Sequence, residues 1–498
     1  MDSLDDIAAI GVDLAVGHPA AAGLLVLTEP AMAKLGLMPA PQLLTDPGPD
    51  GETPTEDLVR SRILDHLTDH GRQIIGRHGW SVSGDRLGPW STIRRGDRAF
   101  RLVLEPFVWM WDPRTDSRTP FLHLPDPADD PSRCWVELAR RLDRLATLLG
   151  VPWSSSAGVT GAALFDQIQR RRQRRGGRVL DRAGVVPELE RTGQQQLEPE
   201  LDWPVMSRRV DSGRPARELS EAELNAATAV HFYDRRGSYL APSGGADLPV
   251  GEPTLIDGDA AHQMIDKVVR YGGERLPAGI WQVSLPQWDE SMPPPHPDQH
   301  RFERVTRWVT TPTLQLLIDH DDLGGAGYTV TDLQPGPAWV WQEHGRLLEP
   351  WYKQVREALL AARSENDDPV DRAIKGVYTA YIGRMDYAAV AAGPRPWHYQ
   401  PMWRAVIIGS SRSGLWRVMR KHQLTTGRIP VSVHVDEVAY LDADSDPTAN
   451  PPAVDTGALG KLKPSGSRLL TAAARAALLR GARVTDNQIW VDPDGDGA

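Results

Sequence analysis

The chain has 498 residues, of which 40% are hydrophobic and 24% are charged, a composition typical of globular proteins. This length predicts about three domains, and the composition excludes collagen-like, disordered and disulfide-scaffold classes. The formal net charge of −10 argues against wholesale nucleic-acid binding, although such a chain can still present a local basic cleft. The single cysteine, Cys134, cannot form an internal disulfide, which favours a reducing cytoplasm.

The first 75 residues predict an acidic extension. The apolar stretch 20–38 contains Glu29 and Lys34, whereas a membrane-spanning helix needs roughly 20 predominantly apolar residues. Aspartates near the start stand where a secretion signal would carry basic residues. We therefore expect a cytoplasmic protein that has no membrane partner. A proline-rich stretch, 39–56, predicts a loop, and a helix is expected over 55–70.

Residues 76–222 predict a second region of mixed structure. Short β-rich runs occur at 90–94, 99–104 and 107–111. An amphipathic helix is expected over 134–149. Three antiparallel strands followed by a helix open many α+β folds, RNase H-like domains among them. The run 167–178 holds six arginines, which predict either a solvated helix end or a strap that follows phosphates.

The first chemical motif lies at 229–242. Its apolar run predicts a strand that ends at Asp234, followed by a turn and by Tyr239. A carboxylate at the end of a strand can hold a divalent metal together with backbone carbonyls. Taken alone, Asp234 is more typical of a turn or cap residue.

The second motif is a predicted helix over 368–383. Arg372 and Lys375 lie about one turn apart on this helix, and Arg363 ends a preceding helix expected over 350–363. Cations on such a helical hairpin can neutralise a triphosphate. A solvated basic helix face is the alternative.

The third motif, at 428–441, indicates a strand with two adjacent carboxylates, Asp436 and Glu437. In the middle of a strand these charges would be desolvated unless a cation compensates for them. A metal is the usual compensation when a third carboxylate is available, and an edge strand with its charges in water is the alternative. Because side chains alternate along a strand, only one of the two easily shares a metal with Asp234.

The order and spacing of these motifs resemble the palm and fingers of family B DNA polymerases, in particular the compact protein-primed type of phages and linear plasmids. Asp234 matches the metal-binding aspartate of the family's first motif. Lys375 and Gly383 keep the lysine-to-glycine spacing of the second motif. Glu437 falls on the catalytic aspartate of the third. The resemblance covers about residues 225–470.

The resemblance implies further site residues. Tyr239 corresponds to the tyrosine beneath the sugar of the incoming nucleotide, and the segment 460–463 is similar to the basic element that grips primer-terminus DNA. The nucleotide contacts implied in this way are Lys375, Arg363, Tyr239 and Arg372. The DNA contacts implied are Lys461, Lys463 and Tyr381.

Some positions depart from the family pattern. In the third motif Val435 stands at the first aspartate and Asp436 at the threonine. We favour Glu437 as the metal ligand and keep Asp436 as the alternative, because a one-residue slip would exchange them. The expected first strand of the N-terminal domain, 88–93, lacks the Asp-x-Glu pair that proofreading exonucleases need.

The fold implied is α+β, with a right-hand polymerase arrangement of palm, fingers and thumb after a degenerate, inactive RNase H-like domain. The implied regions are an extension over 1–75, an exonuclease-type domain with its linker over 76–222, the first half of the palm with an insertion over 223–345, fingers over 346–400, the second half of the palm over 401–445 and a thumb-like region over 446–498.

The activity implied is template-directed DNA polymerisation, in which two Mg²⁺ or Mn²⁺ ions assist nucleotidyl transfer. The partners implied are a DNA primer-template, deoxynucleoside triphosphates and a terminal or priming protein. One alternative is a catalytically weak or dead relative that binds nucleic acid or a terminal protein as a scaffold, which predicts DNA binding without incorporation. A chance match to the motifs predicts neither.

Overall fold

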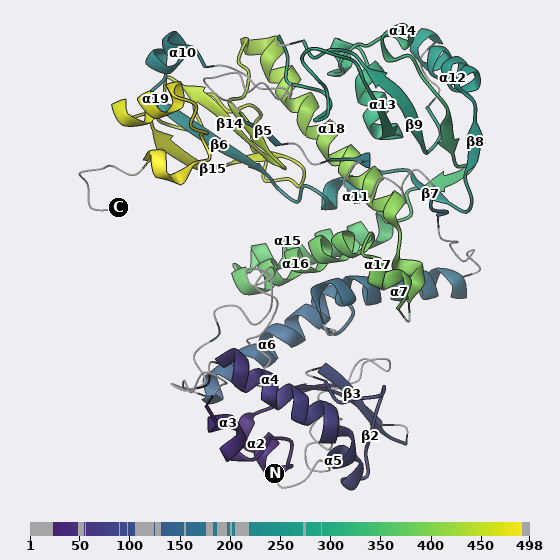
Figure 1. Cartoon of the computed structure of the whole chain (residues 1–498), viewed down its shortest axis with the longest axis vertical. Coiled ribbons are helices and arrows are strands. Elements are labelled where there is room, and N and C mark those ends of the chain that lie inside the picture. Colours follow the sequence, from purple (N-terminus) through teal and green to yellow (C-terminus); the bar gives the residue numbers. More distant parts are fainter. Residues whose placement is uncertain are drawn as a thin grey trace. The chain divides into compact units, whose positions relative to one another are not determined.

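The chain folds into two compact units that both mix helices and strands, as the computed structural model shows (Figure 1). One unit comprises Met1–Gln167 and Glu357–Tyr381, and the other Ile168–Arg356 and Ile382–Ala498. The predicted mixture of α and β structure is thereby confirmed. The residues that the structure describes are 23–47, 54, 56–88, 90–96, 98–104, 124, 131–153, 156–175, 183–186, 197–199, 202–204, 219–271, 275–289, 291–393 and 395–490.

A four-stranded sheet organises the N-terminal part of the first unit, in the order β1-β4-β3-β2. The strands are β1 (Gly23–Leu27), β2 (Ser81–Val82), β3 (Trp90–Arg95) and β4 (Arg98–Leu104). β1 runs parallel to β4, whereas the other neighbours are antiparallel. The strands expected at 90–94 and 99–104 are thus confirmed, and the one expected at 107–111 lies outside the described residues.

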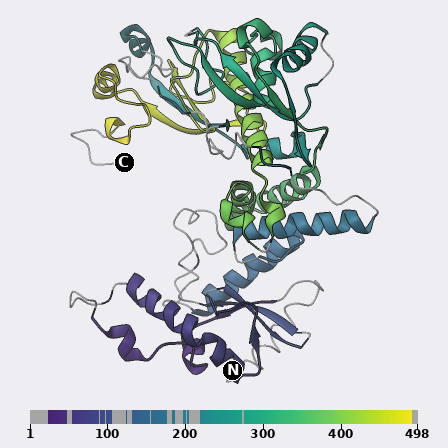
Figure 2. The same ribbon diagram turned by 45° about the vertical axis from the view of Figure 1, so that its right-hand side comes forward.

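The helices between β1 and β2 share one hydrophobic core with this sheet (Figure 2). They are α2 (Glu29–Lys34), α3 (Pro41–Thr45), α4 (Glu56–His66) and α5 (Arg72–Arg77), with a π-helical turn at Leu67–Gly71. Met32 and Ile75 are buried in the same cluster as Leu102. The domain boundary expected at residue 75 therefore falls inside a core, because the early strand β1 pairs with β4 far along the chain. The prediction of a separate N-terminal extension over 1–75 is therefore wrong for the described residues.

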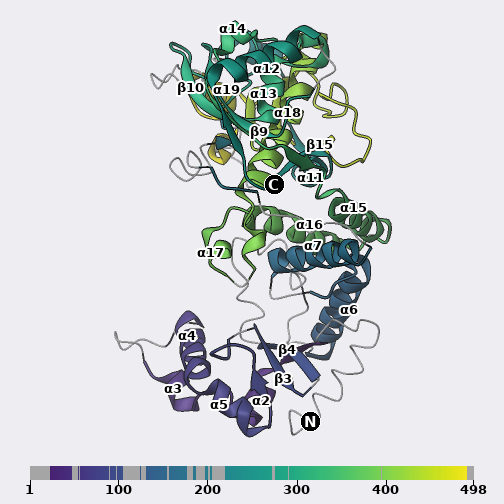
Figure 3. The ribbon, with the colours of Figure 1, turned by 90° about the vertical axis from the view of Figure 1, so that its right-hand side faces the viewer.

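Longer helices lie wholly or partly in the first unit. Their bounds are α6 (Pro131–Leu149), α7 (Ala157–Arg174), α15 (Glu349–Ser364) and α16 (Asp368–Arg384). The helices expected over 134–149, 350–363 and 368–383 are confirmed. α7 lies beside α16 (Figure 3), and Gly161 permits this approach, because a Cβ there would lie 2.6 Å from the Cβ of Tyr381. Arg140 of α6 pairs with Asp367 at 2.7 Å.

The second unit contains a five-stranded antiparallel sheet in the order β15-β6-β14-β13-β5. The strands are β5 (Asp202–Pro204), β6 (Ala229–Arg235), β13 (Ser432–His434), β14 (Glu437–Asp442) and β15 (Leu462–Leu469). Side chains alternate between its two faces. One face carries Tyr233 and Tyr440, which pack on Trp416 of α18 (Pro401–Thr426).

Short helices cover part of the opposite face of the sheet. They are α10 (Glu221–Ala226) and α19 (Ala472–Leu479). Leu224 and Leu478 join Phe232 and Ala439 in a separate hydrophobic cluster. The sheet is therefore a central layer between α18 and these two helices. Its order places the two strands that bear the predicted carboxylates, β6 and β14, side by side.

The chain between β6 and α15 forms a further sheet with the order β10-β9-β11-β8, and the pair β12-β7. These elements are α11 (Leu240–Gly245), β7 (Leu248–Val250), β8 (Thr254–Ile256), α12 (Gly258–Tyr271), β9 (Gly279–Leu285), β10 (Val305–Thr310), α13 (Thr311–Ile318), α14 (Val330–Leu333), β11 (Ala338–Val340) and β12 (Glu343–Gly345). These elements lie within the region 223–345, for which the first half of a palm with an insertion is predicted. α13 packs on α18, so that α18 joins both sheets (Figure 1).

The remaining elements are short: α17 (Ala388–Ala391) and 3₁₀ turns at Asp321–Leu323, Pro396–His398 and Asn487–Trp490. Throughout the described part of the chain, the helices are too short or too polar to cross a bilayer.

Candidate active site

Asp234 lies near the end of β6, where the buried part of the strand gives way to a turn. Gly237 takes the positive φ of +60° that this turn requires. Arg235 donates to the Ser411 carbonyl of α18 at 2.6 Å, and the Ser238 and Ser411 hydroxyls lie 2.8 Å apart. The predicted strand and turn are confirmed, and both are fixed to α18.

The two adjacent carboxylates of the third motif lie at a hairpin turn, not in the middle of a strand. β13 ends at His434, the turn consists of Val435 and Asp436, and Glu437 begins β14. Val435 has a φ of +56°, a conformation that is rare for a β-branched residue. The expectation of a continuous strand is therefore wrong, because the backbone reverses at Val435. Strand alternation does not decide which carboxylate faces Asp234.

A row of polar residues crosses the sheet at the level of this turn. Glu437 is the direct cross-strand partner of Asp234, Lys463 is its partner on the other side, and His434 is paired with Glu437. Cross-strand partners project from the same face of a sheet. The row lies on the face that carries Phe232, opposite the face covered by α18. Residues that are far apart in the sequence are thus brought together.

Two further contacts hold the carboxylates of this row. Lys463 Nζ lies 3.5 Å from Asp234 Oδ2, and both side chains are 35% exposed. Ser465 donates from its hydroxyl to Glu437 Oε2 at 2.9 Å. Lys463 was expected to contact the primer, and here it is the counterion of Asp234. Ser465 carries no sequence signal, because only the register of β15 against β6 brings it to Glu437.

The neighbouring carboxylates disfavour the ionised form of Asp436. Burial and the nearby Asp234 carboxylate raise the pKa of Asp436 to about 6, with Glu437 adding to the effect and Arg235 opposing it. The Asp436 carbonyl accepts the backbone N–H of Arg235 at 3.1 Å. Excess negative charge at this position is what a bound cation would relieve.

The protein side chains at this site could supply only part of the ligand shell of a metal ion. Within the described residues, no three His, Cys, Asp or Glu side chains are grouped closely enough to hold a metal ion. Asp234 with one carboxylate of the hairpin supplies hard oxygen donors, which Mg²⁺ prefers. Mg²⁺ is usually held by one or two carboxylates, with water and substrate phosphates completing its shell. The residues fit that mode of binding.

The predicted nucleotide-binding cations Arg363 and Lys375 come together in the first unit. Arg363 Nε lies 2.9 Å from Asp371 Oδ1, and Lys375 Nζ lies 2.6 Å from Asp371 Oδ2. The Asp371 residue is 7% exposed. One cation from α15 and one from α16 thus share a single carboxylate of α16, as the predicted helical hairpin requires. Arg372 follows Asp371 and is half-buried. The sequence alone does not identify Asp371 as the partner of these cations, although it lies four residues before Lys375, a spacing that brings side chains together on a helix.

Two predicted aromatic contacts have different surroundings. Tyr239 is half-buried and is the N-cap residue of α11, directly after the turn that follows Asp234. Tyr381 is only 2% exposed and packs near Phe165 of α7, with 6.2 Å between the ring centroids. Burial raises the pKa of the Tyr381 phenol well above its usual value. This packing gives Tyr381 a core role, so its DNA contact stays a prediction without structural support. Lys461 is exposed.

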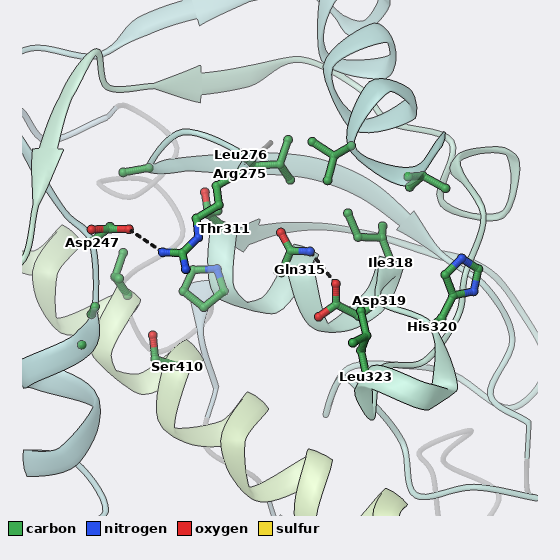
Figure 4. Close-up of a pocket in the computed structure, with 17 residues that line it drawn as sticks. Asp247, Arg275, Leu276, Thr311, Gln315, Ile318, Asp319, His320, Leu323 and Ser410 are labelled. Atoms are coloured by element: carbon green, nitrogen blue, oxygen red, sulfur yellow. Dashed lines mark hydrogen bonds and ion pairs between the residues drawn. The ribbon is translucent and has the colours of Figure 1, made fainter. Parts of the chain in front are cut away.

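A cavity of about 580 Å³ lies among α12, α13 and α18, apart from the residues predicted as site residues (Figure 4). Its polar side chains largely pair with one another. Arg275 lies 3.9 Å from Asp247, and Gln315 donates to Asp319, which also binds Arg417. The predicted chemistry is not located in this cavity.

No protein-family model and no curated protein matches the chain. Solved structures of phi29 DNA polymerase are similar to it at low identity. The orthorhombic crystal form has 13% identity and a TM-score of 0.46, covering 80% of this chain and 74% of that chain. The complex with single-stranded DNA has 13% identity and a TM-score of 0.47, with coverages of 84% and 78%.

The ternary complex of phi29 DNA polymerase with primer-template DNA and incoming nucleotide has 11% identity and a TM-score of 0.46, with coverages of 84% and 79%. Similarity at this level does not assign an activity or a site to this chain.

Proposed function

We propose that the protein is a template-directed DNA polymerase that transfers nucleotides with the help of divalent metal ions. The observation that carries this proposal is the cross-strand pairing of Asp234 with Glu437 beside the hairpin turn. Two motifs that are separate in the sequence meet there: the strand of the first motif, which carries Asp234, and the hairpin of the third motif, which carries Asp436 and Glu437. The family B motif pattern supports the same proposal, with the sheet of β6 and β14 as the palm.

In this proposal Asp234 holds the metal together with Glu437, and Asp436 is the alternative ligand. Bound Mg²⁺ or Mn²⁺ would activate the primer 3′-hydroxyl and stabilise the pyrophosphate leaving group. Lys463 neutralises Asp234 at 3.5 Å, and its ammonium group would be available to the DNA phosphates if a metal compensated Asp234 instead. Ser465 keeps Glu437 oriented through its hydrogen bond.

The cations of α15 and α16 are proposed to bind the triphosphate. Arg363 and Lys375 both pair with the Asp371 carboxylate. A triphosphate that takes over as their ion-pair partner gains two charge-assisted contacts. Tyr239 supports the nucleotide sugar, and Lys461 contacts the primer. The substrates are a DNA primer-template and deoxynucleoside triphosphates, and a terminal or priming protein is a further proposed partner.

The experiment that tests this function is the extension of a labelled DNA hairpin by one nucleotide with Mg²⁺ or Mn²⁺. Asp234→Asn removes a metal ligand at constant size, and we expect a loss of at least about 100-fold in rate with DNA binding retained. Asp247→Asn, at a half-exposed carboxylate of the same unit, is the matched control and should incorporate normally. Equal incorporation by wild type and Asp234→Asn would overturn the proposal.

A second candidate function is a nucleic-acid-binding scaffold derived from such an enzyme. The ion pair between Lys463 and Asp234 favours it, because an ammonium group already compensates the carboxylate that the metal needs. This candidate predicts that the wild-type protein binds the hairpin but incorporates no nucleotide with either metal.

A further inference from the structure

A second cavity, of about 960 Å³, lies between the C-terminal half of α18 and the loop 443–461 that joins β14 to β15. Its volume is within the range of small-molecule sites, roughly 300–1,000 Å³. Much of its wall is apolar and comes from Val418, Leu441 and the prolines Pro451 and Pro452. These surfaces suit a flat, weakly polar body such as a nucleobase.

The cavity carries positive charge that the protein does not compensate. Lys421 of α18 and Lys461, just before β15, both line it and are exposed. Among the residues that the structure describes, neither ammonium group has an ion-pair partner within 4.0 Å. The one carboxylate in the lining, Asp442, is already bound by Arg428 at 2.7 Å and by Asn450 at 3.2 Å. An anionic ligand is therefore favoured.

A buried polar atom in the lining gives independent evidence for a ligand. His422 is only 8% exposed, and its Nε2 has no hydrogen-bond partner in the described structure. Leaving such a group unpaired in a buried position costs free energy. Burial, followed by the nearby Arg428, lowers the pKa of His422 to about 4. The ring is therefore neutral at pH 7 and can exchange a hydrogen bond with a ligand group.

We infer that this cavity binds a nucleotide, with its phosphates between Lys421 and Lys461 and its base along Pro451 and Pro452. The phosphate has two possible sources, a free nucleotide or the nucleotide units of a DNA strand. The cavity described above near α13 lacks this character, because its Arg275 pairs with Asp247 and its Gln315 with Asp319. The inference does not depend on the proposed metal site, since Lys421, His422 and the prolines are separate from Asp234 and Glu437. Lys461 is shared with the proposed function, in which it contacts the primer.

Equilibrium binding in EDTA tests the inference, because chelation of divalent metals removes the ions on which the proposed active site depends. The probes are dATP, inorganic triphosphate and an eight-nucleotide single-stranded DNA. For wild type we expect dATP or the oligonucleotide to bind more tightly than inorganic triphosphate. Lys421→Ala should weaken that binding about tenfold, as removal of a charged hydrogen bond does.

Control variants locate the binding. Lys353→Ala removes an exposed lysine paired with Glu349 on α15 and should leave the Kd unchanged. Asp234→Asn should also bind as wild type does. Binding of dATP that depends on Lys421 identifies a free nucleotide as the ligand, and binding of the oligonucleotide alone identifies a DNA strand. No binding, binding indifferent to Lys421, equal affinity for inorganic triphosphate, or abolished binding in Asp234→Asn would each overturn the inference.

Discussion

Val435 decides where the two adjacent carboxylates of the third motif lie. Its φ of +56° reverses the chain, so that Asp436 occupies the turn and Glu437 begins the strand beside Asp234. Such a backbone conformation costs about 1–3 kcal/mol and is often retained at functional sites. The strained backbone and the cluster of acidic residues occur at the same position, as expected for a hairpin whose role is to position these carboxylates.

Glu437 is predicted to matter more than Asp436 for the chemistry, because it is the cross-strand partner of Asp234 and is oriented by Ser465. We expect Glu437→Gln to lower the rate of nucleotide incorporation by at least about 100-fold, and Asp436→Asn by less than about tenfold. Single-turnover incorporation at saturating DNA measures both. A larger effect for Asp436→Asn would show that the turn residue is the ligand.

His422 predicts an acid-sensitive contribution to stability. Its pKa is about 4 in the folded protein and about 6.5 when unfolded, so the unfolded state binds more protons between these values. The free energy of unfolding is therefore fully supported above about pH 6.5 and falls as the pH drops toward 4, by at most about 3 kcal/mol. Denaturant titrations of wild type and His422→Gln at several pH values measure this. An identical pH dependence in the variant would contradict the assignment.

At the scale of elements, α18 is the part on which the second unit is assembled. It packs on the β6 sheet through Trp416 and on α13 of the inserted region. A buried ion pair secures a third contact: Arg412 lies 2.5 Å from Glu198 Oε2, and both side chains are at most 2% exposed. Glu198 also accepts hydrogen bonds from Thr310 and Thr313.

Removing one partner of this buried pair should destabilise the second unit strongly. Glu198→Ala leaves the Arg412 guanidinium without its counterion, at a cost of about 3–5 kcal/mol in the free energy of unfolding. The control is Glu349→Ala, which breaks a helical ion pair with Lys353 at the surface and should change little. Thermal and denaturant unfolding measure both variants. Equal stability of Glu198→Ala and wild type would show that the pair contributes little.

The end of α7 is predicted to bind DNA phosphates, which is the second of the two interpretations of the arginine-rich run. Its described arginines are all exposed: Arg170, Arg171, Arg172, Arg174 and Arg175. Replacing three of them by glutamine should weaken binding of single-stranded DNA at low salt, regardless of sequence. The slope of log K against log salt should fall by up to about two, at roughly 0.7 for each phosphate that is no longer neutralised.

The control variant replaces three exposed arginines elsewhere by glutamine, which changes the net charge by the same amount. These arginines are Arg346, Arg356 and Arg480. Equal weakening in both triple variants would indicate a general charge effect. In that case the run is a solvated helix end.

At the scale of the whole molecule, local patterns predicted elements well and long-range pairing poorly. The end of β6 at Asp234 and the helix over 368–384 follow from apolar periodicity and from turn or cap residues. The turn at Val435 was missed because Val431, Val433 and Val435 continue an alternating pattern, without the glycine or asparagine that hairpin turns usually carry.

Pairing between distant segments explains the remaining differences. The parallel pairing of β1 with β4 joins the first 75 residues to the next region, and no local signal encodes such a pairing. The register of β15 places Lys463 and Ser465 beside the acidic residues. The pairing of Asp371 with Arg363 depends on how α15 and α16 pack in the helical hairpin, which the sequence does not indicate. The candidate site was therefore predictable in its acidic and basic residues, but not in their counterions.

The most direct test of the central claim is template-directed incorporation of a single nucleotide into a DNA hairpin, with all four deoxynucleotides offered separately in Mg²⁺ or Mn²⁺. The account predicts that wild type adds only the complementary nucleotide, and that Asp234→Asn binds the hairpin but adds none. Undiminished incorporation by Asp234→Asn, or hairpin binding by wild type without incorporation under either metal, would contradict it.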